Sequence, residues 1–190
     1  MKNYYAEAVR LRDAYSSQIK LLIGFESEWT RPTTAGLVVR LMEQCEFDLF
    51  VGSIHHLHTI PIDFDKSRYE RAREISGGTD ERCFEDYFDE QYTMLQTLKP
   101  PVIGHFDLIR LFSDDPDQDF RPMDGVWQRV LRNLGCIVDY GGLLEINSSA
   151  IRKEMSDPYP KKEICKVGPQ RRGEKFLLLP CNGLRTTYAL

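Results

Sequence analysis

Hydrophobic residues in this chain follow two patterns, helical spacing and short continuous runs. Helical spacing predicts helices over residues 3–18, from 32–34 to 45, over 66–75, from 80 to about 98 and from 124 to 135. The runs predict buried strands at Ile19–Phe25, Phe47–Ile54 and Val102–Phe106, and a further strand from Cys136–Val138 and Leu143–Asn147. Residues 56–65 contain a proline and no helical period, which predicts a loop. Alternating helices and strands predict an α/β fold with a parallel sheet, as a β/α barrel or an open doubly wound sheet.

Three of the predicted strands end in side chains that can bind metal ions or transfer protons. They are followed by Glu26 and Glu28, by His55 and His56, and by His105 and Asp107. Both candidate folds bring the carboxyl ends of their strands to one edge. Imidazole and carboxylate ligands without thiolates suit zinc, manganese or iron, and such an ion lowers the pKa of a bound water. We therefore predict metal ligands at Glu26, His55 and His105, whereas Glu28, His56 and Asp107 are each interpreted as structural or supporting residues.

Composition and charge exclude several classes of protein. The formal net charge is -4, and no block of basic residues interleaves with aromatic ones, so nucleic acid is not an expected partner. No apolar run reaches the roughly 20 residues of a membrane span, and the start of the chain lacks the apolar core of a signal peptide, so we expect a cytoplasmic protein. The five cysteines are widely spaced, which argues against disulfides and a thiolate zinc site.

Four ordered motifs resemble the histidinol-phosphatases of the polymerase-and-histidinol-phosphatase (PHP) superfamily, and the fungal members most. The motifs are Gly24–Trp29, Val51–Asp65, Leu98–Arg110 and Leu144–Ser149, and the resemblance covers roughly residues 5–165. Other catalytic signatures are missing, because the chain has no GxSxG, P-loop or GxGxxG sequence. Ser53 and His55 are too close in sequence to be interpreted as a nucleophile and its base.

The resemblance implies a distorted (β/α)7 barrel that holds up to three divalent metal ions. It implies hydrolysis of L-histidinol phosphate to L-histidinol and phosphate, in histidine biosynthesis. Glu26, His55 and His105 match metal ligands of the family, and we expect the two histidines to be catalytic as well. Arg110 and Arg152 fall where the family has arginines near the substrate phosphate. Glu145 and Asn147, in the last motif, are expected to have supporting roles.

The sequence also departs from the family pattern. That pattern opens with a His-x-His ligand pair and a further histidine and closes with Asp-x-His, none of which occurs here. We therefore expect residues 1–165 to form a partial PHP domain without its first and last strands, and residues 166–190 to be a non-homologous, disordered tail. The chain alone is expected to be inactive or nearly so.

Two alternatives remain open. One is a catalytically dead PHP remnant that at most binds a metal or a partner. The other is a different PHP phosphoesterase, for example one that acts on nucleic-acid ends, although the acidic balance of the chain weighs against it. The sequence does not determine the metal or the oligomeric state.

Overall fold

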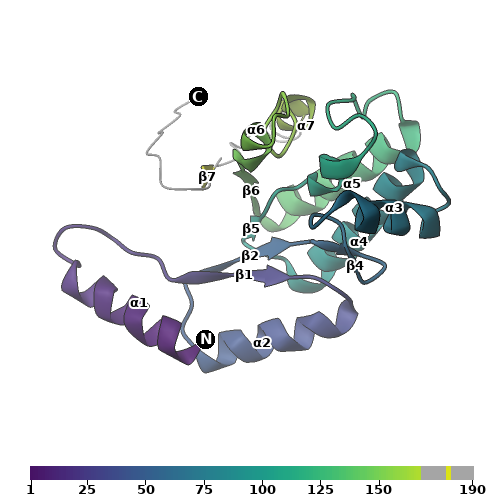
Figure 1. Ribbon diagram of the computed structural model, residues 1–190. Coiled ribbons are helices and arrows are strands. Elements are labelled where there is room, and N and C mark those ends of the chain that lie inside the picture. The colour runs from purple at the N-terminus through teal and green to yellow at the C-terminus, as the bar shows by residue number, and fades with distance from the viewer. Residues whose placement is uncertain (168–178, 181–190) are drawn as a thin grey trace.

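The computed structural model describes residues 1–167 and 179–180, and a parallel sheet forms its centre (Figure 1). The strand order is β1-β2-β5-β6-β7, and every neighbouring pair is parallel. The strands are β1 (Gly24–Glu28), β2 (Leu49–Ser53), β5 (Val102–Ile103), β6 (Leu143–Ile146) and β7 (Leu179–Pro180). A separate antiparallel hairpin pairs β3 (His56–Leu57) with β4 (Ile60–Pro61). The predicted α/β fold with a parallel sheet is confirmed.

Helices connect the strands and cover the sheet. They are α1 (Lys2–Ala14), α2 (Ala35–Gln44), α3 (Lys66–Ile75), α4 (Asp80–Leu98), α5 (Asp124–Tyr140), α6 (Ser149–Arg152) and α7 (Lys162–Val167), with 3-10 turns η1 (Pro32–Thr34) and η2 (Leu108–Phe112). Figure 1 shows α1 and α2 beside β1 and β2, whereas α3, α4 and α5 gather at the other end of the molecule. The arrangement is that of an open, partial β/α barrel.

Helix α4 supplies much of the hydrophobic core. Its N-cap, Thr79, accepts a hydrogen bond from the backbone of Arg82, and acidic residues occupy the first turn, where the helix dipole favours them. Phe84 and Phe88 on its inner face have no exposed surface. The helix ends where Lys99 adopts a left-handed conformation before two prolines. Because α4 leads directly into β5, its packing fixes the position of that strand.

Helix α5 is longer than the sequence predicts. Its predicted end at Gly135 is wrong, and the strand predicted at Cys136–Val138 is also wrong, because both lie inside a helix that continues to Tyr140. Ile137 is fully buried and extends the apolar face of this helix. That burial offsets the cost of about 1 kcal/mol of a glycine inside a helix. Gly141, with φ 77°, ends the helix in the left-handed region that glycine adopts easily.

The first strands also differ from their predicted bounds. The strand predicted at Ile19–Phe25 begins at Gly24, because pairing with β2 fixes its register, so Glu26 and Glu28 lie within β1 rather than beyond it. The loop predicted at residues 56–65 contains the β3–β4 hairpin. Of the predicted tail, residues 166–167 belong to α7 and 179–180 pair with β6, and the others lie outside the described residues.

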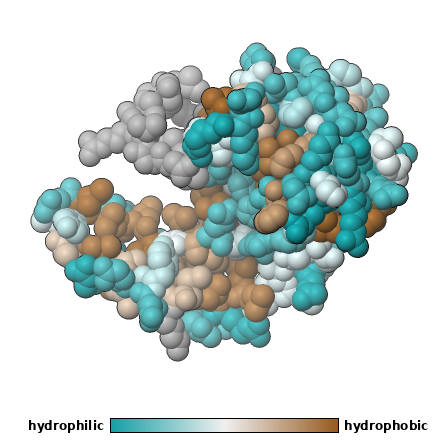
Figure 2. Space-filling view, in the orientation of Figure 1, coloured by the Kyte–Doolittle hydropathy of each residue, from teal (hydrophilic) through white to brown (hydrophobic). Residues whose placement is uncertain are grey.

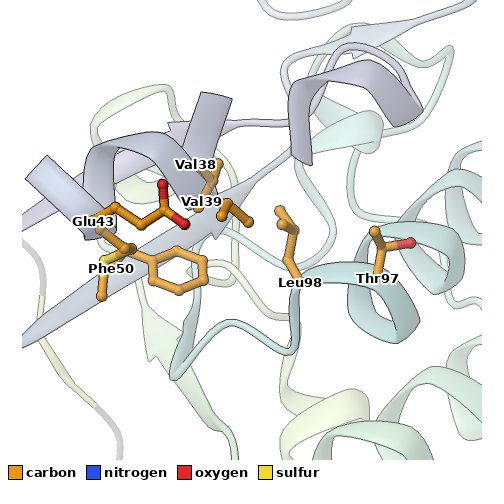
Figure 3. Close-up of a pocket in the computed structure, with 7 residues that line it drawn as sticks. Val38, Val39, Glu43, Phe50, Thr97 and Leu98 are labelled. Carbon is orange, nitrogen blue, oxygen red and sulfur yellow. The ribbon is translucent and has the colours of Figure 1, made fainter. Parts of the chain in front are cut away.

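An apolar groove lies between α2 and the end of α4 (Figure 3). Its volume is about 310 Å³, and it is lined by Val38, Val39, Met42, Glu43, Phe50, Thr97 and Leu98. Phe50 and Leu98 mark the amino-terminal side of β2 and β5, so the groove lies away from the strand ends that carry the predicted ligands. Among the described helices, none is both long and apolar enough to cross a membrane.

Candidate metal centre

Glu26, His55 and His105 meet at one edge of the sheet. Glu26 Oε1 lies 3.1 Å from His105 Nε2 and 3.8 Å from His55 Nε2. The centroids of the two imidazole rings are 4.6 Å apart. One possible ligand atom from each residue lies within 4.8 Å of those of the other two. The structure therefore brings together the three residues predicted from the sequence, although their role as ligands is still a prediction.

The local structure explains why these side chains converge. Glu26 lies in β1 opposite Val51 of β2, and His55 and His105 follow the ends of β2 and β5. His105 has φ 23°, and its backbone N–H donates a hydrogen bond to Glu145 Oε2 at 2.9 Å. Such a conformation is costly for a residue with a side chain, so this hydrogen bond stabilises the turn that directs the imidazole towards Glu26.

Gly104 lets the strand ends pack this closely. A Cβ atom at this position would lie 2.5 Å from Ser53 Oγ and 3.0 Å from a methyl group of Val51. Real carbon and oxygen atoms do not approach to 2.5 Å without displacement. A side chain at residue 104 would therefore displace the Ser53 and Val51 side chains of β2, close to His55 and His105.

The electrostatics of the cluster favour the protonation states that bind a metal. The hydrogen bond from His105, assisted by the Ser53 hydroxyl, lowers the pKa of Glu26 to about 2 despite partial burial. Burial, followed by the charge of His105, lowers the pKa of His55, although the carboxylates of Asp63, Glu26 and Glu28 oppose this shift. An ionised carboxylate and a neutral imidazole are the forms that coordinate metals.

The donor set fits a divalent ion. Two imidazole nitrogens and one carboxylate oxygen are ligands that zinc, manganese and iron accept. His105 turns its Nε2 towards Glu26, so this nitrogen is the one available to a metal. We therefore find the residues compatible with the metal that the sequence predicted.

The predicted supporting residues surround the cluster. His56 and Glu28 contact each other closely, beside the three donors. Glu145 Oε2 also accepts a hydrogen bond from Asn147 Nδ2 at 3.2 Å, so Asn147 holds the carboxylate that positions His105. Asp107 is completely buried, and burial raises its pKa although Arg110 opposes the shift.

Arg110 and Arg152, the two predicted phosphate contacts, have different environments. Arg110 has no exposed surface, and its Nη atoms donate to the backbone carbonyls of Pro116, Asp157 and Pro158 at 2.9, 2.7 and 2.9 Å. A phosphate could reach this guanidinium only after those bonds break, which favours a structural role, and the predicted phosphate contact of Arg110 stays a prediction. Arg152, in α6, is exposed, and among described residues the only hydrogen bond of its side chain is a long one to the Ser148 hydroxyl.

Asp63 is a residue near the cluster that the sequence analysis did not single out. It is half-buried, and among the carboxylates that raise the pKa of His55 it has the largest effect. The available signal was its place in the Val51–Asp65 motif, where we interpreted the segment only as a loop. The hairpin that turns this segment back onto His55 has no clear period in sequence.

Comparison with known families identifies the fold. The sequence model of the PHP domain matches residues 1–149, which is most of the chain. The protein belongs to the PHP domain family. This membership agrees with the resemblance found in the sequence and with a site at the carboxyl ends of parallel strands.

Two curated relatives of this PHP-family protein are fungal. It is 42% identical over 165 residues to the "Probable histidinol-phosphatase" of Schizosaccharomyces pombe, an alignment that covers 86% of this chain and 54% of the relative. It is 31% identical over 203 residues to the histidinol-phosphatase of Saccharomyces cerevisiae, and this alignment covers 93% of this chain and 61% of the relative. The chain thus spans little more than half the length of these relatives.

A solved structure shows the same fold. The histidinol phosphate phosphatase of Lactococcus lactis, crystallised with zinc, L-histidinol and phosphate, aligns with a TM-score of 0.70. The alignment covers 94% of this chain and 64% of that protein, at 18% sequence identity. At this identity the match supports the architecture, and it confirms the predicted PHP-type barrel fold.

Proposed function

We propose that this protein is a metal-dependent phosphomonoesterase that hydrolyses L-histidinol phosphate to L-histidinol and phosphate, in histidine biosynthesis. The observation that carries the proposal is the convergence of Glu26, His55 and His105 at one edge of a PHP-type sheet. The two fungal relatives are both named as histidinol-phosphatases, which supports the choice of substrate. Since the substrate is an intermediate of amino-acid biosynthesis, we place the reaction in the cytoplasm.

Zinc is the metal best supported, because the Lactococcus protein was crystallised with it, and manganese or iron would suit the same donors. A divalent ion at this site would polarise a phosphoryl oxygen and lower the pKa of the attacking water. Glu26, His55 and His105 would hold one such ion of the family's cluster of up to three. The ionised carboxylate of Glu26 would balance part of its charge.

The chain's own residues would orient the substrate beside the ion. His55 and His105 would act in catalysis through the ion that they hold, and His55, whose side chain is 25% exposed against 9% for His105, is the more open to the substrate. Arg152 is exposed and could bind the phosphate through two hydrogen bonds. Glu145 and Asn147 would keep His105 in position.

The test is phosphate release from L-histidinol phosphate by the purified chain with zinc or manganese. We expect slow, metal-dependent release, because three protein donors leave an ion weakly held. Glu26→Gln should abolish it, whereas Glu70→Gln, which removes an exposed carboxylate of α3, should not. Zinc binding without any release would instead indicate a remnant that only binds metal. Equal hydrolysis of unrelated phosphomonoesters would indicate a different PHP phosphoesterase.

A further inference from the structure

The segment after His55 turns back at once as a tight hairpin. Strands β3 and β4 have two residues each, and His58 and Thr59 form the turn between them. Both turn residues have positive φ, 51° and 65°, as in the type I′ turns that join such strands. Asparagine and glycine favour these conformations, whereas the β-branched Thr59 is strained there. The turn therefore depends on contacts outside the hairpin.

His58 makes such contacts from the tip of the hairpin. Its Nε2 lies 2.8 Å from the hydroxyl oxygen of Ser76 and 3.1 Å from Asp86 Oδ2. Ser76 is the C-cap of α3, and Asp86 lies in α4. Because a carboxylate oxygen can only accept a hydrogen bond, Nε2 carries a hydrogen and donates it to Asp86. One half-buried imidazole thus joins the hairpin to two helices.

The base of the same hairpin is His55. The N–H of Ile62, directly after β4, donates to the carbonyl of His55 at 2.9 Å, which continues the pairing of β3 with β4 to the predicted ligand. Leu57 and Ile62 are buried, so the arms of the hairpin pack against the core. Two strands of this length do not keep a fixed orientation alone. A tilt of the hairpin at its tip would therefore turn the peptide group of His55 at its base.

The orientation of that peptide group determines where the imidazole of His55 lies. Its Nε2 is 3.8 Å from Glu26 Oε1, which is 3.1 Å from His105 Nε2. Glu26 is held by its place within β1, and His105 by the hydrogen bond from its backbone to Glu145. His55 lies two residues beyond the end of β2, where the pairing of that strand has stopped. The hairpin is therefore what holds this third member of the cluster.

We propose that His58 is a positioning residue of the metal centre, which holds the β3–β4 hairpin on α3 and α4 and thereby keeps His55 in the position of a ligand. The inference rests on the proposed function, because it takes His55 to be a ligand of the metal. Zinc binds imidazole nitrogens at about 2.0 to 2.1 Å, so a small shift of the ring weakens binding. Residues that orient a ligand directly change metal affinity by about 10- to 100-fold. His58 acts from the far end of the hairpin, so its effect should be smaller.

The experiment measures the zinc affinity of the full chain by competition with a chelator, at a temperature at which circular dichroism shows each variant to be folded. A contact that contributes only to folding leaves the affinity of the folded protein unchanged, so this readout separates positioning from stability. We expect His58→Ala to weaken zinc binding about three- to tenfold. Asp86→Ala, which removes the acceptor on α4, should also weaken it, and the double variant should bind zinc as His58→Ala does.

Two further variants provide a rescue and a matched control. Thr59→Gly relieves the strain at the second turn position, so its addition to His58→Ala should recover part of the lost affinity. Tyr69→Phe removes the 2.7 Å hydrogen bond from the Tyr69 hydroxyl to Asp80, which joins α3 to α4 without the hairpin. It should lower stability and leave zinc affinity unchanged.

Wild-type zinc affinity in either His58→Ala or Asp86→Ala would overturn the inference, so a failure of the first variant to fold leaves the second to decide it. Losses that add in the double variant, or an equal loss in Tyr69→Phe, would overturn it as well. Phosphate release from L-histidinol phosphate by the wild type tests the proposed function separately. Release by the wild type, with unchanged zinc affinity in the variants, keeps the function and refutes the role of His58. Weakened zinc binding in the variants, without release by the wild type, leaves that role and refutes the function.

Discussion

Arg110 and Asp107 form an ion pair that solvent does not reach. Arg110 Nε lies 3.2 Å from Asp107 Oδ2, and neither side chain has any exposed area. Asp107 also accepts the backbone N–H of Lys161 at 3.0 Å. The pair therefore ties η2 to the segment before α7, and its removal should change stability more than substrate affinity.

We predict that Arg110→Met lowers the free energy of unfolding by about 3 to 5 kcal/mol, because it leaves Asp107 charged, buried and unpaired. Adding Asp107→Asn should recover part of that loss, since the uncompensated charge is then gone. Urea unfolding of the two single variants and the double variant measures this coupling. An Arg110 variant with unchanged stability but weaker binding of phosphate would support the substrate contact predicted from sequence.

As a predicted metal ligand, Glu26 should affect the affinity for the metal but not the pH dependence of that affinity. Its pKa is lowered to about 2, so it stays ionised as the pH falls, and protons compete for the imidazoles first. We predict that zinc affinity falls as the pH drops below about 6.5, the ordinary pKa of histidine, because burial lowers the pKa of His55 and it is protonated only below that pH. Glu26→Gln should weaken zinc binding at least about tenfold both above and below this pH, against no change in Glu70→Gln. Competition with a chelator measures zinc affinity and its pH dependence. Equal zinc affinity in Glu26→Gln and the wild type would contradict the role of Glu26 as a ligand.

The three clustered residues were predictable because each stands at the end of an apolar run, where parallel strands bring side chains together. The buried environment of Arg110 was not predictable, since its partners are the backbone carbonyls of residues 116, 157 and 158 and no sequence pattern indicates such contacts. Asp63 was missed for a similar reason. The hairpin that returns it to His55 is only two residues per strand.

At the level of elements, Gly104 controls how closely β2 and β5 approach at the site. We predict that Gly104→Ala destabilises the protein by about 1 to 3 kcal/mol, because its Cβ would overlap Ser53 Oγ. It should also weaken zinc binding by separating His105 from Glu26. Gly36→Ala in α2 is the matched control, since nothing lies within 4 Å of its added Cβ, and it should raise stability by about 0.5 to 1 kcal/mol.

Thermal unfolding and zinc titration of the two glycine variants check this prediction together. An unchanged zinc affinity in Gly104→Ala would show that the strands tolerate the added methyl group without moving the ligands. A destabilised Gly36→Ala would show that α2 is constrained by contacts other than its local conformation.

Element types were easier to predict than element ends. α3 and α4 were predicted with their bounds, because local signals delimit them: Gly77 and Gly78 follow α3, Asp80 begins α4, and two prolines follow its end. The predicted end of α5 and the predicted start of β1 were wrong, because contacts with residues distant in sequence determine these two positions. Ile137 is buried against the core, and Gly24 pairs with Leu49, which lies on another strand.

At the scale of the whole molecule, the fold leaves apolar surface at one end. Figure 2 shows hydrophobic residues gathered over α1 and α2. On α2, Leu37 and Val39 are 54% and 50% exposed, and Val39 lines the apolar groove of Figure 3. In the described residues, β1 pairs only with β2, so its other edge is open. Apolar patches and open strand edges both promote association between chains.

We predict that the chain self-associates as its concentration rises, through the surface formed by α2 and the edge of β1. Leu37→Glu combined with Val39→Glu should shift the protein towards monomers, because two charges would be desolvated on contact. Both positions are exposed, so the change should cost less than about 0.5 kcal/mol of stability. Ile75→Glu, at an isolated apolar residue of α3 that is 57% exposed, is the control and should leave association unchanged. Sedimentation velocity over a concentration series measures the distribution between monomers and larger species. This surface does not drive association if the wild type stays monomeric throughout. The same conclusion follows if the double variant and Ile75→Glu have equal effects.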